Sequence, residues 1–306
     1  KYTVFGTDKI IPKIKKQKNF FVCNLLDFKK IKDIIKTIKP DIIIHLAAQS
    51  TVDFIDKKKE YIKNNTYVTR NIIRSIHKNK TKHFLFSSTA AVYKNSNKKL
   101  TEKSQLSPNN IYGKTKLDCE KLIINNINKG TKTNFIIFRF FNVCSSLISL
   151  KIGEMHNPET HLIPILSSKF KKNKKVFIYG NNFRTKDKTC VRDYIHIADI
   201  VKAFDKGIKY LLKNKKSEII NLGTKKGFST LSIFKTFKNF YNYKYKEPFF
   251  KKRRKGDVDK LICDNKKSYK ILKWYPKFSV ISKIIDDEKK WVNFIAKKKI
   301  IRKTVY

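Results

Sequence analysis

Short apolar runs alternate with longer segments of helical periodicity in the first half of the chain. Short runs rich in Ile, Leu and Phe predict buried strands at residues 41–46, 84–87 and 135–140. Between them, residues 60–76 and 112–127 repeat apolar positions at helical spacing. This alternation predicts right-handed βαβ units and a parallel sheet with helices on both faces. We therefore expect an α/β, Rossmann-like, doubly wound fold, which binds ligands at the carboxyl ends of its strands.

The pattern changes to shorter, mixed elements after residue 142. Helices and strands are predicted there at residues 162–171 (helix), 176–179 (strand), 218–221 (strand) and 230–240 (helix). No linker or repeat separates the two halves. We therefore assign residues 1–143 to the doubly wound domain and residues 144–306 to a smaller α+β domain packed over the strand ends.

Hydroxyl side chains end the second predicted strand, and a tyrosine and a lysine follow one loop later. The Ser-Pro pair at 107–108 is expected to cap the helix that carries Tyr112 and Lys116. Residues four apart share a helix face, so the ammonium would lower the pKa of the phenol from its ordinary value of about 10. Thr89, just past its strand, would offer a hydroxyl to the same substrate oxygen. This arrangement predicts redox chemistry on an alcohol.

The composition is strongly basic, with 71 Lys and Arg against 24 Asp and Glu and a formal net charge of +47. Such a charge usually indicates nucleic acid or an anionic membrane surface as partner. Here, however, the lysines are scattered along the whole chain among abundant Ile, Asn and Phe, which are residues with A/T-rich codons. We therefore expect no specific nucleic-acid partner. We also expect no membrane partner, because no apolar segment approaches the roughly 20 residues of a membrane span.

Cysteine and histidine positions indicate neither a disulfide framework nor a metal centre. The five cysteines show no C-x-x-C spacing, and the six histidines do not cluster with them. Reduced thiols, together with the lack of a visible signal peptide, favour a cytoplasmic location.

Taken together, these residues resemble the UDP-glucose (UDP-galactose) 4-epimerases of the extended short-chain dehydrogenase/reductase family. The similarity extends in order from about residue 20 to about residue 280. Besides Tyr112 and Lys116, the matching segments are residues 45–48 (His-Leu-Ala-Ala), 64–65 (Asn-Asn), 86–93 (Phe-Ser-Ser-Thr-Ala-Ala-Val-Tyr), 139–142 (Arg-Phe-Phe-Asn), 158–164, 191–196 and 253–257.

The resemblance implies NAD as cofactor, bound in the first domain. The residues expected to hold it are Asn24, Leu25, Leu46, Ala47, Ala48, Asn65, Ser87, Tyr112, Lys116 and Phe140.

The resemblance further implies a UDP-hexose substrate, bound mainly by the second domain, and a homodimeric assembly. Arg192 and Arg254 would bind the diphosphate, since guanidinium groups are bidentate donors to phosphate oxygens. Asp257 would bind the ribose and Tyr179 would lie against the uracil. The other residues expected at the substrate are Thr89, Asn142, His161, Leu162 and Leu261, the last of these on the C2 side of the hexose.

The implied reaction inverts the configuration at C4 of the sugar. Tyr112 would take the proton of the 4-hydroxyl while C4 loses a hydride, with Thr89 bonded to the same oxygen. Dehydratases of similar sequence carry an acidic pair where this chain has Ala90 and Ala91, so epimerisation is favoured over loss of water. A uronate epimerase, a decarboxylase, and an inactive basic binding protein on a decayed epimerase scaffold remain alternatives.

Several positions depart from the family pattern near the cofactor. Asn24 replaces an acidic residue, and Gly6 stands where an acid would hold the adenosine ribose, with Asp8 as a substitute. No G-x-x-G-x-x-G turn precedes residues 2–5. These residues would form the second strand of a complete doubly wound sheet. We therefore expect the first strand and its glycine-rich turn to be missing from this chain and to belong to an extension of about 25 to 30 residues. The present chain would then bind NAD poorly. Counted in the complete fold, the second and third strands would lose their hydrogen-bond ladder to the fourth.

Overall fold

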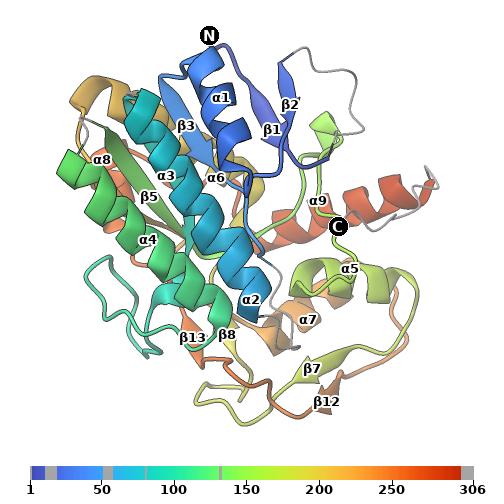
Figure 1. Ribbon diagram of the computed structural model, residues 1–306. Coiled ribbons are helices and arrows are strands. Elements are labelled where there is room, and N and C mark those ends of the chain that lie inside the picture. Colours follow the sequence, from blue (N-terminus) through green and yellow to red (C-terminus); the bar gives the residue numbers. More distant parts are fainter. Residues whose placement is uncertain (1, 11–18, 51–57, 80, 131–132, 298–306) are drawn as a thin grey trace.

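The computed structural model describes residues 2–10, 19–50, 58–79, 81–130 and 133–297. A parallel sheet lies between two layers of helices, and shorter strands and helices gather beyond its carboxyl-terminal edge (Figure 1). This is the α/β, Rossmann-like arrangement expected from the alternating pattern.

The central sheet has four parallel strands in the order β10-β5-β4-β3. The strands are β3 (Ile42–His45), β4 (His83–Thr89), β5 (Asn134–Phe140) and β10 (Glu218–Leu222). The sequence predicted a strand at all four positions. Thr89 pairs with Phe140, whereas β3 already ends where His45 pairs with Phe86. The end of β4 therefore projects beyond β3 toward the remainder of the protein.

Alternate residues of the central strands enter different cores, as a strand period of two requires. Phe84 and Phe86 belong to one core cluster, which packs against the helices of one face. Leu85 belongs to a second cluster with Trp274, on the opposite face. The first face is covered by α2 (Lys58–Tyr61), η1 (Ile62–Tyr67), α3 (Val68–Asn79) and α4 (Ile111–Gly130), with α1 (Phe28–Ile38) against α3. The second face is covered by α6 (Ile197–Asn214) and α8 (Lys266–Leu272).

Two helix predictions need correction. The helix predicted over residues 60–76 is not uniform, because η1 has π-helical geometry between two α-helical pieces. The cap of α4 is Asn110 rather than the pair at 107–108: its side-chain oxygen accepts the amide of Gly113 at 2.7 Å. Gly113 is required there, since a Cβ would lie 2.4 Å from the carbonyl oxygen of Ala91. The first turn of α4 thus lies directly against the turn that follows β4.

A separate parallel pair, β1 (Gly6–Asp8) and β2 (Phe20–Val22), forms the amino-terminal ladder. The prediction of a strand at residues 2–5 is wrong by a few positions, because the strand begins at Gly6. The sequence led us to expect that these strands lose their ladder to the next strand. Within the described ranges, no hydrogen-bond ladder joins β1 and β2 to β3. Ile44 and Val22 keep 41% and 38% of their surface exposed, so apolar strand residues face solvent in this region.

The second half builds a core of its own around three helices. These helices are α5 (Leu162–Lys171), α7 (Thr230–Lys238) and α9 (Ile281–Lys297). The short strands pair as β6 (Asn142–Cys144) with β9 (Tyr194–His196), β7 (Phe177–Tyr179) with β12 (Phe249–Lys251), and β8 (Val191–Arg192) with both β11 (Phe228–Ser229) and β13 (Lys260–Leu261). Two single turns, η2 (Ala90–Val92) and η3 (Ile148–Leu150), complete the described elements. The domain division at residue 143 stays a proposal, because β10, α6 and α8 pack with the first half.

A buried ion pair joins α4 to the central sheet. The Arg139 guanidinium on β5 is 2.6 Å from a carboxylate oxygen of Glu120 on α4, and the two side chains are 2% and 1% exposed. Arg139 also donates to the Tyr93 hydroxyl at 2.9 Å, and that hydroxyl lies 2.7 Å from Asn221 of β10. Ser88 of β4 donates to the same carboxylate of Glu120. The network therefore fixes α4 against three adjacent strands.

We expect Glu120→Gln to lower the free energy of unfolding by about 3 to 5 kcal/mol, because it leaves the buried Arg139 charge uncompensated. Urea denaturation followed by circular dichroism measures this. Asp205→Asn is the control, since it removes only an exposed pair with Lys209 and should change stability by less than about 0.5 kcal/mol. Equal effects of the two substitutions would contradict the structural role assigned to the buried pair.

Candidate active site

The three residues predicted to be catalytic meet at the carboxyl end of β4. Tyr112 and Lys116 lie one turn apart on α4, and Glu120 continues the same face one turn later. The Thr89 side chain hydrogen-bonds the Tyr112 phenol, and its Oγ1 also accepts the amide of Ala91 at 3.1 Å. The Lys116 side chain is 2% exposed, and its ammonium lies 4.2 Å from the centre of the Phe86 ring.

Burial governs the protonation of both groups on α4. It raises the pKa of Tyr112 to about 12, although the hydrogen bond from Thr89 acts in the opposite direction. It lowers the pKa of Lys116 to about 8. The expected lowering of the Tyr112 pKa below its ordinary value is therefore not found in the protein alone, because burial disfavours the phenolate. A phenolate at this position needs a further positive charge nearby.

The residues predicted to hold the cofactor lie along the ends of β3 and β4. The Ser87 hydroxyl donates to the carbonyl of His45 at 3.2 Å, which joins the two strand ends. Asn65 is buried; it accepts the amide of Gln49 at 2.7 Å and donates to Thr115 of α4 at 3.0 Å. These bonds hold the loop of Leu46, Ala47 and Ala48 against α4. Leu46 remains 60% exposed at the edge of this loop.

Three further cofactor predictions occupy different surroundings. The Asn24 side chain accepts the amide of Leu26 at 3.0 Å, while Leu25 packs against the core beside α1. The Phe140 ring packs against Phe204, with the ring centres 5.9 Å apart. The Phe140 side chain therefore belongs to the core, and only its backbone at the strand end is available to a cofactor.

Four of the predicted substrate residues form one basic and aromatic cluster. The Arg254 guanidinium lies over the Tyr179 ring, 4.0 Å from its centre. Arg192 is 3.4 Å from a carboxylate oxygen of Asp257 and also donates to the carbonyl of Val258 at 2.8 Å. The loop that carries Arg254 and Asp257 reaches α4, because Gly256, at φ +85°, lies against the carbonyl of Asn109. This cluster thus lies beside the amino terminus of the helix that carries Tyr112.

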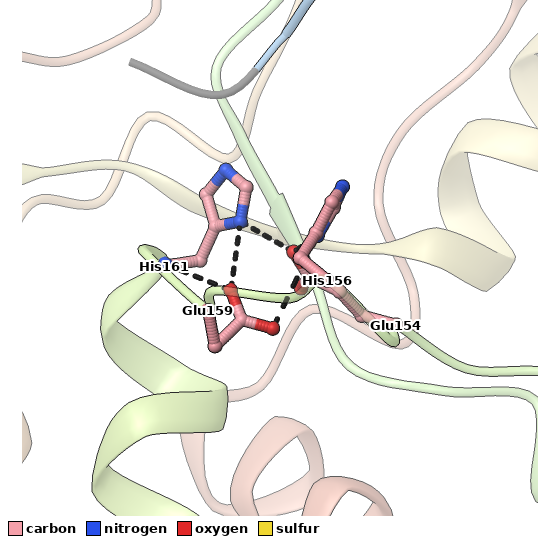
Figure 2. Close-up of side chains that lie close together, drawn as sticks. All are labelled: Glu154, His156, Glu159 and His161. Carbon is pink, nitrogen blue, oxygen red and sulfur yellow. Dashed lines mark hydrogen bonds and ion pairs between the residues drawn. The ribbon is translucent and has the colours of Figure 1, made fainter. Parts of the chain in front are cut away.

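The remaining substrate predictions are placed separately. Leu261 packs against the buried cluster that contains Ala90 and Val92, directly after Thr89. The Asn142 amide donates to the carbonyl of Asp193 at 2.9 Å. Leu162 begins α5 and packs into the core of the second half. His161 precedes it, and its ring contacts the carboxylates of Glu154 and Glu159 (Figure 2).

Comparison with known proteins agrees with this arrangement. The sequence model of the NAD dependent epimerase/dehydratase family matches residues 1–223. The chain belongs to this family. A UDP-glucose 4-epimerase of Lactobacillus helveticus is 34% identical over 89% of this chain and 83% of its own length.

Solved structures give the same result. The UDP-glucose 4-epimerase of Stenotrophomonas maltophila, solved with NAD and formylated UDP-arabinopyranose, superposes with a TM-score of 0.85 at 25% identity, over 91% of this chain and 84% of that one. The UDP-Glc/GlcNAc 4-epimerase of Campylobacter jejuni is 31% identical with a TM-score of 0.75, over 90% of this chain and 84% of that one. In the part of this epimerase/dehydratase that the structure describes, no helix combines the length and apolarity needed to cross a membrane.

The residues of this family member fit the nicotinamide side of NAD. The Lys116 amine is buried and, among the residues described, has no hydrogen-bond acceptor, so it is available to a ribose hydroxyl. Leu46 and Ala47 lie open at the strand ends beside it. The nine glycines of the sequence do not include the closely spaced set that forms the glycine-rich turn for the pyrophosphate.

Sequence reasoning missed two groups of residues in this epimerase/dehydratase. Glu120 and Arg139 position α4, and extending the four-residue spacing from Tyr112 and Lys116 would have pointed to Glu120. The second group is a cluster of two glutamates and two histidines within residues 154–161. Its signal is local, because all four side chains occur within a single short segment.

We expect Lys116 to make stability depend on pH in alkaline solution. Its folded pKa is about 8, against about 10.4 for an unfolded lysine, so between these values the unfolded state binds a proton that the folded state lacks. Stability attributable to Lys116 therefore rises as pH increases from about 8 to about 10.4. Urea midpoints at the two ends of this range should differ less in Lys116→Met than in the wild type. Lys114→Met, on the exposed side of the same helix, should retain the wild-type difference.

Proposed function

We propose that this protein interconverts UDP-glucose and UDP-galactose by inverting C4 of the sugar. The observation that carries the proposal is the meeting of Tyr112, Thr89 and Lys116 at the end of β4, in a chain 34% identical to a UDP-glucose 4-epimerase over 89% of its length. The proposed substrate is a UDP-hexose, and the proposed cofactor is NAD.

In the proposed mechanism, Tyr112 accepts the proton of the 4-hydroxyl and later returns it. Thr89 donates to the same oxygen as negative charge develops on it. Lys116 binds the nicotinamide ribose. When bound, NAD supplies the hydride acceptor and donor for C4. The sugar passes through a 4-keto form and turns over about its diphosphate before the hydride returns to the other face.

The substrate residues divide between the two ends of the nucleotide in this proposal. Arg192 and Arg254 bind the diphosphate, with Tyr179 against the uracil and Asp257 on the ribose. The contacts support this division, because Arg254 already stacks on Tyr179 and Arg192 is paired with Asp257. Substrate would replace that pairing by a phosphate contact, since a guanidinium forms bidentate bonds with either anion.

Ala90 and Ala91 favour epimerisation over dehydration, since neither side chain can transfer a proton. Both belong to η2, directly after Thr89. A uronate epimerase or a decarboxylase would use the same tyrosine, and product analysis distinguishes these activities.

Following the family resemblance, we also propose a homodimer in the cytoplasm. Light scattering tests the assembly.

The direct experiment incubates the purified chain with UDP-galactose, with and without added NAD, and measures UDP-glucose. We expect Tyr112→Phe to lower kcat by about 100-fold or more, because it removes only the proton-transferring hydroxyl. Binding of UDP should change little. Tyr269→Phe, at a 56% exposed position, serves as the control and should keep full activity. Turnover of Tyr112→Phe near the wild-type rate would exclude the proposed mechanism, and absence of any UDP-glucose in the wild type would favour a decayed scaffold.

Leu261 gives a prediction about sugar size. It packs against the buried cluster that includes Ala90 and Val92. By the family resemblance, its side chain is intermediate between the tyrosine that narrows this pocket and a small residue that admits an N-acetyl group. We therefore expect UDP-GlcNAc to be converted measurably but more slowly than UDP-glucose, and Leu261→Ala to reduce the difference. Initial rates on both sugars measure this. Equal wild-type rates would mean that the pocket is wider than leucine implies.

A further inference from the structure

The segment that leads into α5 gathers four potential metal ligands around one point (Figure 2). Glu154, His156, Glu159 and His161 each offer one ligand atom, and these atoms all lie within 4.8 Å of one another. Each residue is half-buried, so the cluster is shielded yet open to small ions. His161, which the sequence predicts at the substrate, is assigned to this cluster instead, and none of the four residues belongs to the groups that meet at Tyr112.

The separations suit a small cation. The Nδ1 of His156 is 2.8 Å from a Glu154 oxygen and 4.0 Å from Oε2 of Glu159. The Nδ1 of His161 is 3.2 Å from Oε1 of Glu159 and also contacts Glu154. A tetrahedral ion with ligand distances of about 2.1 Å separates its ligand atoms by about 3.4 Å. The observed separations lie on both sides of that value, so small side-chain adjustments would close the set around one ion.

One carboxylate oxygen in the cluster accepts no hydrogen bond from the described residues. The Glu159 side chain is 10% exposed, and among the described atoms its buried Oε2 receives no hydrogen bond. The His161 ring contacts Oε1 and not Oε2, and the contact of Oε2 with His156 is longer than a hydrogen bond. A buried acceptor without a hydrogen bond is costly, and a native structure usually explains one by an ion or water. Oε2 points toward His156, where a cation between the two would satisfy it (Figure 2).

We propose that Glu154, His156, Glu159 and His161 form a binding site for one divalent transition-metal ion, with Zn²⁺ the best fit. Imidazole nitrogens together with carboxylate oxygens suit zinc, whereas Ca²⁺ and Mg²⁺ prefer oxygen alone. The two carboxylates also neutralise the charge of the ion. This inference differs from the sequence-based expectation of no metal, which considered only spacing relative to the cysteines.

The location indicates a structural role. The Trp291 indole of α9 donates to the carbonyl of Glu154 at 2.9 Å, and Gly153 lies against the same ring. His161 is the residue directly before α5. A metal ion at this point would therefore link the segment held by α9 to the start of α5, and would fix a connection of the second half without taking part in chemistry at C4.

The test titrates Zn²⁺ into the full chain, stripped beforehand with a chelator, against a chromogenic competitor. We expect one equivalent to bind and the thermal unfolding midpoint to rise, because an ion that binds only the folded state stabilises it. His156→Ala and Glu159→Gln should each weaken binding by about 10-fold or more. Glu247→Gln, at an exposed carboxylate outside the cluster, should bind as the wild type does. Near-ultraviolet circular dichroism checks that each variant is folded.

Substitution with Co²⁺ identifies the ligands independently. Nitrogen and oxygen donors should give visible bands without the sulfur charge-transfer band that thiolates produce. A charge-transfer band would place the ion on cysteine and overturn the proposal. Absence of saturable binding, or unchanged affinity in both folded variants, would overturn it as well. Because the readout is metal binding rather than turnover, these outcomes are independent of epimerase activity.

Discussion

The ion pair between Arg139 and Glu120 is the constraint on which the site depends. It places a positive charge from β5 and a negative charge from α4 in the interior, where neither tolerates the loss of the other. Tyr112 and Lys116 lie on the same helical face as Glu120, two turns and one turn nearer the amino terminus, respectively. Fixing Glu120 therefore fixes the rotation of α4 and with it the direction of both groups. Gly113 completes the arrangement by letting the first turn approach Ala91.

Desolvation explains why the site needs its ligands. Burial shifts both Tyr112 and Lys116 toward their neutral forms, with pKa values of about 12 and about 8. The same burial makes any charge brought into the site act strongly, since the surroundings screen it poorly. The protein therefore holds the reacting groups in place in surroundings of low polarity. NAD, the cofactor of the family, would supply the remaining charge of the site.

Some of the few acidic residues of this strongly basic chain are buried and bind backbone amides. Asp199 is fully buried and accepts the amides of Lys277 and Phe278 at 2.9 and 2.8 Å. Asp193 is also fully buried and accepts the amide of Thr224 at 2.8 Å. Carboxylates at such positions hold loops in place, and their replacement by lysine would remove the acceptors of these amides. Scattered surface lysines carry no such constraint.

The sequence by itself determined the strands of the central sheet, the position of α5 and the shared face of Tyr112 and Lys116. These features follow from local periodicity, which a single segment carries. The sequence did not determine that Asn110 caps α4, because several polar residues precede the helix and only its contact with η2 selects one. It also gave no indication that β10 would complete the first sheet.

The tertiary structure alone decided the protonation of Tyr112 and Lys116, the pairing of Arg192 with Asp257, and the convergence of Glu154 with His161. Burial and long-range contacts set these properties, and neither is encoded in the spacing of residues along one segment. A pairing such as Arg139 with Glu120 joins a strand to a helix, so it exists only when the sheet and its helices have packed. Local sequence thus specified the elements, and the low-polarity interior that they enclose specified the chemistry.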